Sequence, residues 1–193
     1  IREGLGEIFK IALIKSEELF DKIEKSASKL LQGDFYNKPQ GRVLLSQSLR
    51  LMLEEIHENP EEDILRRSVD FGHTFSPLVE MESVSNASYR RLPHGYAVAY
   101  DCLLSSVISN IRGKLSDGDL SRIFNLYLIF DFDFSNPVYM DHDLMWASVL
   151  EMTKHRGNNQ HIPIPTGIGQ FCFIEDLTYD ELKIAKKRLA KLL

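Results

Sequence analysis

Two histidines stand out because each lies in an apolar, glycine-marked segment at the edge of a predicted helix. His73 belongs to residues 70–77 (DFGHTFSP), and His94 belongs to residues 92–95 (LPHG). Upstream, Glu7 lies on a third predicted helix. A carboxylate and two imidazoles form a ligand set that suits a catalytic divalent metal and leaves positions open for a substrate. One interpretation of these residues is therefore a metal site.

Each of these residues also has a simpler interpretation. Glu7 and Lys10 share one helix face, so they form either a solvated charged stripe or a polar pair that faces a cleft. His73 in an apolar context is typical of a structural histidine. His94 at a helix N-terminus is typical of a capping residue, although the helix dipole there also favours the neutral imidazole that binds metals. The residues lie on separate elements and converge only through the fold, so their spacing alone proves no site.

Two further polar segments are candidates for binding. Arg66 and Arg67, with Asp70, form either a phosphate or polyol site or a surface ion-pair cluster. Residues 154–161 (KHRGNNQH) form the densest polar run of the chain and include His155. This run is either an exposed loop or an anion-binding and proton-transfer loop that folds over a site.

Helices are expected to position these residues, because apolar side chains recur at helical spacing through most of the chain. Ser16 is a candidate N-cap that would divide the first stretch, residues 5–31, into two helices. Residues 161–174 differ, since their prolines and glycines predict an extended segment or a short hairpin. The sequence predicts a mainly α fold, with helices at about residues 43–57, 95–111, 120–129, 141–154 and 178–192, and another that begins at Ser76.

The helix predicted at residues 43–57 is amphipathic. Asn59-Pro60 ends it, because the residue before a proline disfavours helical geometry. Its apolar positions recur every three to four residues, so we expect one face to be buried. The residues expected to point inward are Leu44, Leu45, Leu49, Met52, Leu53 and Ile56.

Length and composition limit the remaining possibilities. The 193 residues are enough for one domain with a substantial core, or at most two small domains. The net charge of −5 argues against a nucleic-acid partner, because phosphate neutralisation needs clustered Lys and Arg. No apolar run approaches the roughly 20 residues that span a membrane, and no signal peptide is visible. Cys102 and Cys172 lie in apolar stretches, which favours buried free thiols and a cytoplasmic location.

The first residues lack a Met and already have the pattern of a helix start, so we expect the C-terminal part of a longer protein. Residues 4–10 (GLGEIFK) resemble the metal-binding helix of the sugar phosphate cyclases, the dehydroquinate synthase superfamily. Residues 70–75 and 92–99 resemble the two histidine motifs of that family, in matching order and spacing. The resemblance implies that residues 1–193 form a single helical metal- and substrate-binding domain. The NAD-binding α/β domain would be N-terminal to it, with the active site between the two.

The resemblance also implies roles for individual residues. Glu7, His73 and His94 would be the ligands of a divalent metal, usually zinc or cobalt, and Lys10 and Arg66 would contact the substrate. The implied reaction comprises transient oxidation of a secondary alcohol by NAD, β-elimination of phosphate, re-reduction, ring opening and aldol closure. NAD would be bound mainly by the N-terminal domain, so we expect the isolated domain to be inactive. The family also implies a homodimer of the full-length protein.

Several positions depart from dehydroquinate synthase in the direction of one branch of the family. The chain has Asp70 where that enzyme has Asn, Pro77 where it has a third His, and Met-Leu at residues 52–53 where it has a Lys. These residues resemble the 2-epi-5-epi-valiolone synthase branch, which cyclises sedoheptulose 7-phosphate. Such changes make a pocket less cationic, which suits a neutral polyol better than a carboxylate. We expect Asp70 to act in catalysis and His155 or Arg156 to face the substrate.

Three other functions stay open at this point. The first is 3-dehydroquinate synthase itself, the shikimate-pathway enzyme, whose substrate is acidic. The second is an iron-type alcohol dehydrogenase, which also holds its metal through histidines in a helical domain, although Pro77 in place of a third histidine weakens this option. The third is a non-catalytic helical domain that kept the fold, against which the intact Glu7, Lys10, His73 and His94 argue.

Overall fold

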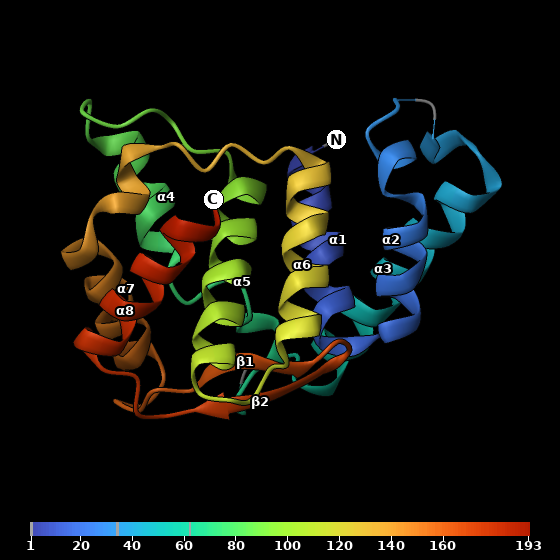
Figure 1. Cartoon of the computed structure of the whole chain (residues 1–193). Coiled ribbons are helices and arrows are strands. Elements are labelled where there is room, and N and C mark those ends of the chain that lie inside the picture. The colour runs from blue at the N-terminus through green and yellow to red at the C-terminus, as the bar shows by residue number, and fades with distance from the viewer. Residues whose placement is uncertain (1, 34, 62) are drawn as a thin grey trace.

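The computed structural model describes residues 2–33, 35–61 and 63–193, and helices dominate these ranges (Figure 1). The α-helices within them are α1 (Arg2–Lys15), α2 (Glu17–Leu30), α3 (Pro39–Glu58), α4 (Ser76–Ser85), α5 (His94–Ile111), α6 (Asp117–Phe130), α7 (His142–His155) and α8 (Tyr179–Leu192). Short 3-10 helices occur at η1 (Phe35–Asn37), η2 (Ser68–Asp70) and η3 (Pro137–Met140). The predicted mainly α fold is therefore confirmed.

The central element is α5, which packs against α1, α4, α6 and α8 (Figure 1). Nearly all of its residues are buried, because apolar or small side chains occur on every face of the helix. The middle of α1 is buried in the same way, from Leu5 to Ile14. The two helices that carry Glu7 and His94 are thus the most deeply packed elements, and they form the rigid frame of the candidate site.

A two-stranded antiparallel hairpin lies across one end of the helices, at the bottom of Figure 1. Its strands are β1 (Ile162–Gly167) and β2 (Gln170–Ile174), within the segment predicted to be extended. Gly169 turns the chain between them with a φ of +79°, a conformation that glycine adopts readily. The Gly169 N–H donates to the carbonyl of Leu13 at 2.8 Å, so the hairpin tip is fixed to the end of α1.

Helix starts follow the predicted capping residues. Ser16 accepts a hydrogen bond from the N–H of Leu19 and divides residues 5–31 into α1 and α2, as expected. The side chains of Asp141 and Thr178 cap α7 and α8 in the same way. These local hydrogen bonds are why the boundaries could be placed from the sequence.

The prediction for α3 was wrong in two respects. The helix begins at Pro39 rather than near residue 43, because proline at the first helical position fits its fixed φ. Its apolar face is also not buried. Leu44 is buried, but the exposed fractions are 38% for Leu45, 56% for Leu49, 62% for Leu53 and 49% for Ile56.

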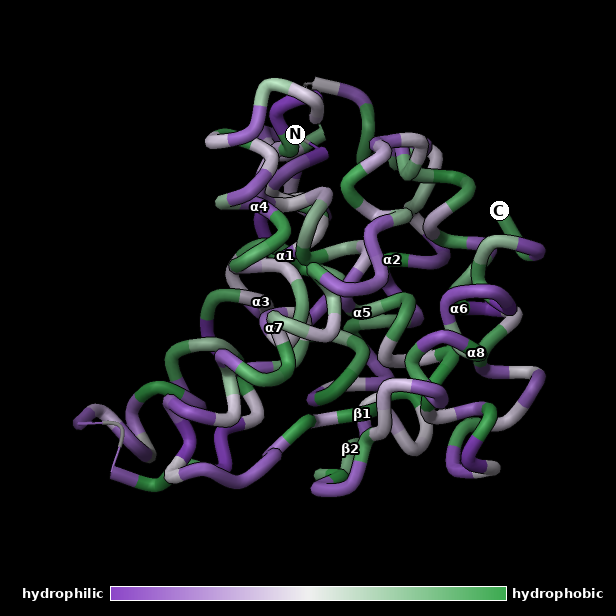
Figure 2. The backbone as a smooth tube through the Cα atoms, turned by 90° about the vertical axis from the view of Figure 1, so that its left-hand side faces the viewer, coloured by the Kyte–Doolittle hydropathy of each residue, from purple (hydrophilic) through white to green (hydrophobic). Residues whose placement is uncertain are grey.

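The physical reason is that α3 carries apolar residues on more than one side, so periodicity does not determine which side is covered. The side of α3 that contains Leu44 and Ser48 is the buried one, and α3 packs against α1 and α2. Figure 2 shows apolar residues, coloured green, recurring along the remainder of α3.

Two expectations from composition can be compared with the structure. Cys102 is buried and Cys172 is partly buried, and both are free thiols. In the ranges that the structure describes, no helix combines the length and the apolar character needed to cross a membrane.

Candidate metal centre

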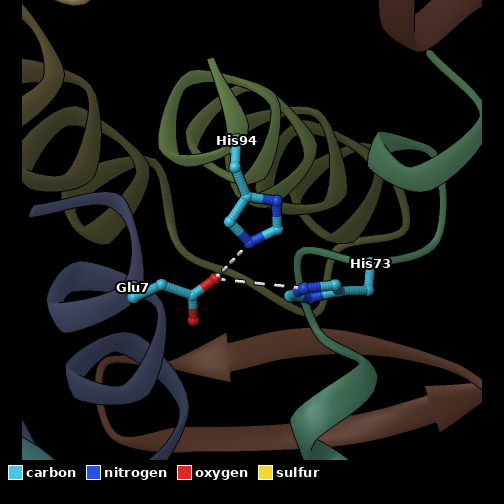
Figure 3. Close-up of side chains that lie close together, drawn as sticks. All are labelled: Glu7, His73 and His94. Atoms are coloured by element: carbon cyan, nitrogen blue, oxygen red, sulfur yellow. Dashed lines mark hydrogen bonds and ion pairs between the residues drawn. The ribbon is translucent and has the colours of Figure 1, made fainter. Parts of the chain in front are cut away.

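The structure brings Glu7, His73 and His94 together from three elements, as Figure 3 shows. Glu7 lies on α1, His73 on the turn before α4, and His94 is the first residue of α5. Glu7 Oε1 is 3.2 Å from His94 Nε2 and 3.9 Å from His73 Nε2. One ligand atom from each residue lies within 4.8 Å of the others.

Two glycines explain why Glu7 and His94 are adjacent. A Cβ atom added to Gly6 would overlap the backbone of Gly95, and one added to Gly95 would overlap the backbone of Glu3. The backbones of α1 and α5 are therefore in direct contact at this point. Since each glycine directly neighbours a ligand residue, the helix contact places the two side chains at the same spot. Sequence reasoning did not recognise this role of the glycines.

His73 is held by the turn that precedes α4. Gly72 has a φ of +79°, and a Cβ added to it would lie 2.9 Å from Cys102 Sγ. The buried carboxylate of Asp101, on α5, accepts hydrogen bonds from the N–H groups of Phe75 at 2.6 Å and Ser76 at 2.9 Å. Asp101 thus caps α4 from a neighbouring helix and fixes the turn on which His73 lies.

Asp101 is a residue that sequence reasoning missed. Its side chain is fully buried, and this burial raises its pKa to about 7, although the N–H groups of Phe75 and Ser76 oppose the shift. The available signal was an acidic residue in the middle of an otherwise apolar helix, because such a residue needs buried hydrogen-bond donors as partners.

Lys10 is not part of a solvated stripe, because only 3% of it is exposed. Its Nζ forms an ion pair with Glu7 Oε2 at 2.8 Å and lies 3.5 Å from the carbonyl of Val69. The two oxygens of Glu7 therefore have different partners, Lys10 on one side and the histidines on the other. This arrangement holds the carboxylate with Oε1 directed towards both imidazoles.

The electrostatics of Glu7 and His73 suit a cation, whereas at His94 burial lowers the pKa but the carboxylates of Glu80 and Glu7 outweigh burial and raise the pKa overall. Burial raises the pKa of Glu7, but the charge and hydrogen bond of Lys10 and the nearby histidines outweigh burial and lower the pKa overall. Burial lowers the pKa of His73, and the charge of Lys10 lowers it further, against the opposing charge of Glu7. An anionic carboxylate and a neutral imidazole are the forms that bind divalent metals.

The distances also fit a metal ion. Ligand bonds to zinc are about 2.0–2.2 Å long, so two donors of one tetrahedral ion lie about 3.4 Å apart. The separations of 3.2 and 3.9 Å from Glu7 to the two imidazoles bracket that value. Within the described residues, this donor set fits a divalent metal with three protein ligands.

Asp70 lies in a buried ion-pair cluster rather than free in a pocket. Its Oδ1 accepts from Arg67 Nε at 3.0 Å and Nη2 at 2.7 Å. Its Oδ2 accepts from Arg156 Nε at 2.8 Å, and Arg156 Nη2 lies at the same distance. The cluster ties η2, just before His73, to the polar run that begins at the end of α7.

His155 and Arg66 have different positions. His155 lines a cleft between α4 and α7 together with His73, Pro77 and Arg156. Its side chain is largely exposed and its Nε2 is 3.3 Å from Glu151. Arg66 pairs with Glu175 and lines a different depression, next to η2. The structure therefore places His155 in the same cleft as the candidate ligand His73 and leaves Arg66 outside that cleft.

The chain is similar to several known enzymes. A 2-epi-5-epi-valiolone synthase from Streptomyces hygroscopicus subsp. jinggangensis is 39% identical over 99% of this chain and 46% of its own length. The solved structure of that synthase, with NAD+ and Zn2+ bound, has a TM-score of 0.91 and covers 98% of this chain and 51% of its own. A 3-dehydroquinate synthase from Dictyoglomus turgidum is more distant, at 28% identity over 96% of this chain and 50% of its own length.

The chain spans about half the length of the curated relatives it matches. The family model for the 3-dehydroquinate synthase C-terminal domain matches residues 4–155, which contain Glu7, His73 and His94. The chain belongs to the 3-dehydroquinate synthase C-terminal family.

Proposed function

We propose that the full-length protein is an NAD- and metal-dependent sugar phosphate cyclase. It would convert sedoheptulose 7-phosphate into a cyclitol of the 2-epi-5-epi-valiolone type, with loss of phosphate. Residues 1–193 would be its helical metal- and substrate-binding domain. The observation that carries the proposal is the convergence of Glu7, His73 and His94. The 39% identity to a 2-epi-5-epi-valiolone synthase supports this branch over the more distant 3-dehydroquinate synthases.

Glu7, His73 and His94 would hold the metal, Zn2+ or Co2+, with a position open for a substrate oxygen. When bound, the metal supplies a Lewis acid that polarises the hydroxyl group undergoing oxidation. NAD, bound mainly outside residues 1–193, supplies a hydride acceptor that is regenerated within the same cycle.

The chain's own residues would orient the substrate. Lys10 Nζ has three N–H donors, and two described acceptors, Glu7 and Val69, account for two of them. The third can donate to a substrate hydroxyl beside the metal position. His155 lines the cleft that also contains His73, and there it could exchange a proton with a substrate oxygen.

Charge balance supports a neutral sugar end as the substrate group in this cleft. Asp70 pairs with Arg67 through one oxygen and with Arg156 through the other, and so offsets part of their positive charge. Pro77 and Met152, which also line the cleft, carry no charge. A cleft whose cationic charge is reduced in this way would bind a polyol better than a more cationic cleft would.

The test is phosphate release by the full-length protein supplied with NAD and zinc. Sedoheptulose 7-phosphate is compared with the seven-carbon acidic substrate of 3-dehydroquinate synthase. Release from the neutral sugar alone is the expected result. Release from the acid alone would assign the protein to 3-dehydroquinate synthase, and release from neither would favour a dehydrogenase relative or a non-catalytic domain.

The reaction class, the location, the activity of residues 1–193 alone and the oligomeric state belong to the same proposal. The enzyme would be a carbon–oxygen lyase acting in the cytoplasm, and residues 1–193 alone would be inactive because NAD is bound mainly elsewhere. The full-length protein would be a homodimer. Light scattering during size-exclusion chromatography measures the oligomer, and the phosphate assay on residues 1–193 measures whether they are active alone.

A further inference from the structure

We infer that Glu80 is a positioning residue for the metal ligand His94. Its carboxylate accepts a hydrogen bond from the N–H at His94 Nδ1 and so holds the imidazole with Nε2 directed at the metal position. The inference rests on the proposed metal centre of Glu7, His73 and His94. It adds a fourth residue, which does not itself bind the metal.

The two nitrogens of His94 have two different carboxylate partners. Nδ1 lies 2.8 Å from Glu80 Oε2, and Nε2 lies 3.2 Å from Glu7 Oε1. A neutral imidazole carries one N–H, so a proton held at Nδ1 leaves the lone pair of Nε2 free for a metal. The hydrogen bond to Glu80 therefore selects the tautomer that the metal centre requires.

A hydrogen-bond partner that fixes the ring orientation matters more for His94 than for His73. The side chain of His94 is 48% exposed, so packing restrains its ring only in part. His73 is more buried, and its Nδ1 lies 3.4 Å from the carbonyl of Phe71 rather than against a carboxylate. A carboxylate partner fixes the ring and also makes the imidazole a stronger donor to a metal. Glu80 thus restrains the ring of His94, as burial in part restrains the ring of His73.

The position of Glu80 follows from how α4 and α5 hold each other. Asp101 on α5 caps the start of α4 and fixes the turn that carries His73. Glu80, in the second turn of α4, reaches back to His94 at the start of α5. The same pair of helices therefore orients both histidines, with Glu80 on α4 hydrogen-bonded to His94 on α5.

The alternative is that Glu80 and His94 form an ordinary surface ion pair. Such pairs contribute little to stability, and their loss has no effect on a neighbouring metal. The two roles differ in their consequence for metal affinity and for the metal's spectrum, which can be measured without any substrate.

The experiment uses the full-length protein after removal of metal with a chelator. Co2+ is titrated into the wild-type protein and into Glu80→Gln, Glu80→Asp and Glu82→Gln, and binding is followed by visible d–d absorption. Glu82 is a matched control, because it lies on the same helix and bonds Asn86 rather than a histidine. We expect Glu80→Gln to weaken Co2+ binding by about 10- to 100-fold and to shift the absorption bands. Glu80→Asp should recover part of the affinity, and Glu82→Gln should match the wild type.

The outcomes separate this inference from the proposal on which it rests. Wild-type binding together with unchanged affinity and bands in Glu80→Gln would overturn the role of Glu80 and leave the metal centre intact. Absence of Co2+ binding in the wild type would overturn the metal centre and the inference together. Circular dichroism of the metal-free proteins verifies folding. If Glu80→Gln does not fold, the Co2+ affinity and absorption bands of Glu80→Asp are compared with those of the wild type instead.

Discussion

Gly6 of α1 and Gly95 of α5 lie so close that neither position has room for a side chain. A methyl group on Gly6 would overlap the carbonyl of Gly95, and a methyl group on Gly95 would overlap that of Glu3. Glu7 directly follows Gly6, and His94 directly precedes Gly95. The separation of the two helices therefore sets the separation of the two candidate ligands.

Gly95→Ala should therefore weaken metal binding as well as stability. The added methyl group must push α1 and α5 apart, and overpacking of this kind costs about 1 to 3 kcal/mol. Gly4→Ala is the matched control, since a Cβ there meets nothing within 4 Å and alanine favours a helix by about 0.5–1 kcal/mol. Thermal unfolding and Co2+ titration of both variants test this. Wild-type Co2+ affinity in Gly95→Ala would show that the helix contact does not set the ligand spacing.

His73→Ala should abolish stoichiometric metal binding while leaving helical content nearly unchanged. The ligand set falls from three donors to two, and His73 lies on a turn rather than inside a helix. Bound zinc per chain is measured by atomic absorption, and helical content by circular dichroism. The control is His57→Ala, which changes an exposed histidine on α3 and should leave the protein's bound zinc unchanged. The ligand assignment fails if His73→Ala retains a full equivalent of zinc.

The elements and the candidate ligands could be predicted because their signals are local. Ser16 and Thr178 mark helix starts through hydrogen bonds to residues three positions away. The segments around Glu7, His73 and His94 are short, and each carries its own pattern. Resemblance to a family linked these segments, which the residues alone could not do.

The supporting residues could not be predicted, because their roles depend on contacts between distant helices. Asp101 acts on Ser76, 25 residues away, and Glu80 acts on His94 across the interface of α4 and α5. The exposed side of α3 has a similar cause. Helical periodicity identifies apolar stripes, but which of them is covered depends on where the neighbouring helices lie, as Leu44 and Leu53 illustrate.

Asp101 should give the protein a distinctive pH dependence of stability. Burial raises its pKa from the ordinary 3.8 to about 7, so the folded state binds this proton more tightly than the unfolded state. For this group the free energy of unfolding then falls as pH rises from about 4 to about 7. Asp101→Asn cannot titrate, so its stability relative to the wild type should rise over that range by a few kcal/mol, at about 1.4 kcal/mol per pKa unit. Urea unfolding at several pH values measures the difference in unfolding free energy between Asp101→Asn and the wild type. The contributions of the other titrating groups cancel in this difference. A difference that stays constant with pH would contradict the prediction.

Asp70→Asn should both destabilise the protein and change its substrate preference. Removing the charge leaves Arg67 and Arg156 without the carboxylate they share, and loss of one partner from a buried ion pair costs about 3 kcal/mol. The added positive charge beside the cleft should favour the acidic substrate over sedoheptulose 7-phosphate by roughly tenfold in kcat/KM. Denaturant unfolding and phosphate release measure the two effects. Asp133→Asn, which breaks an exposed pair with Arg90, should cost less than about 1 kcal/mol and leave the preference unchanged. A destabilised Asp70→Asn protein with the wild-type preference would mean that Asp70 holds the fold together without setting the charge that the substrate meets.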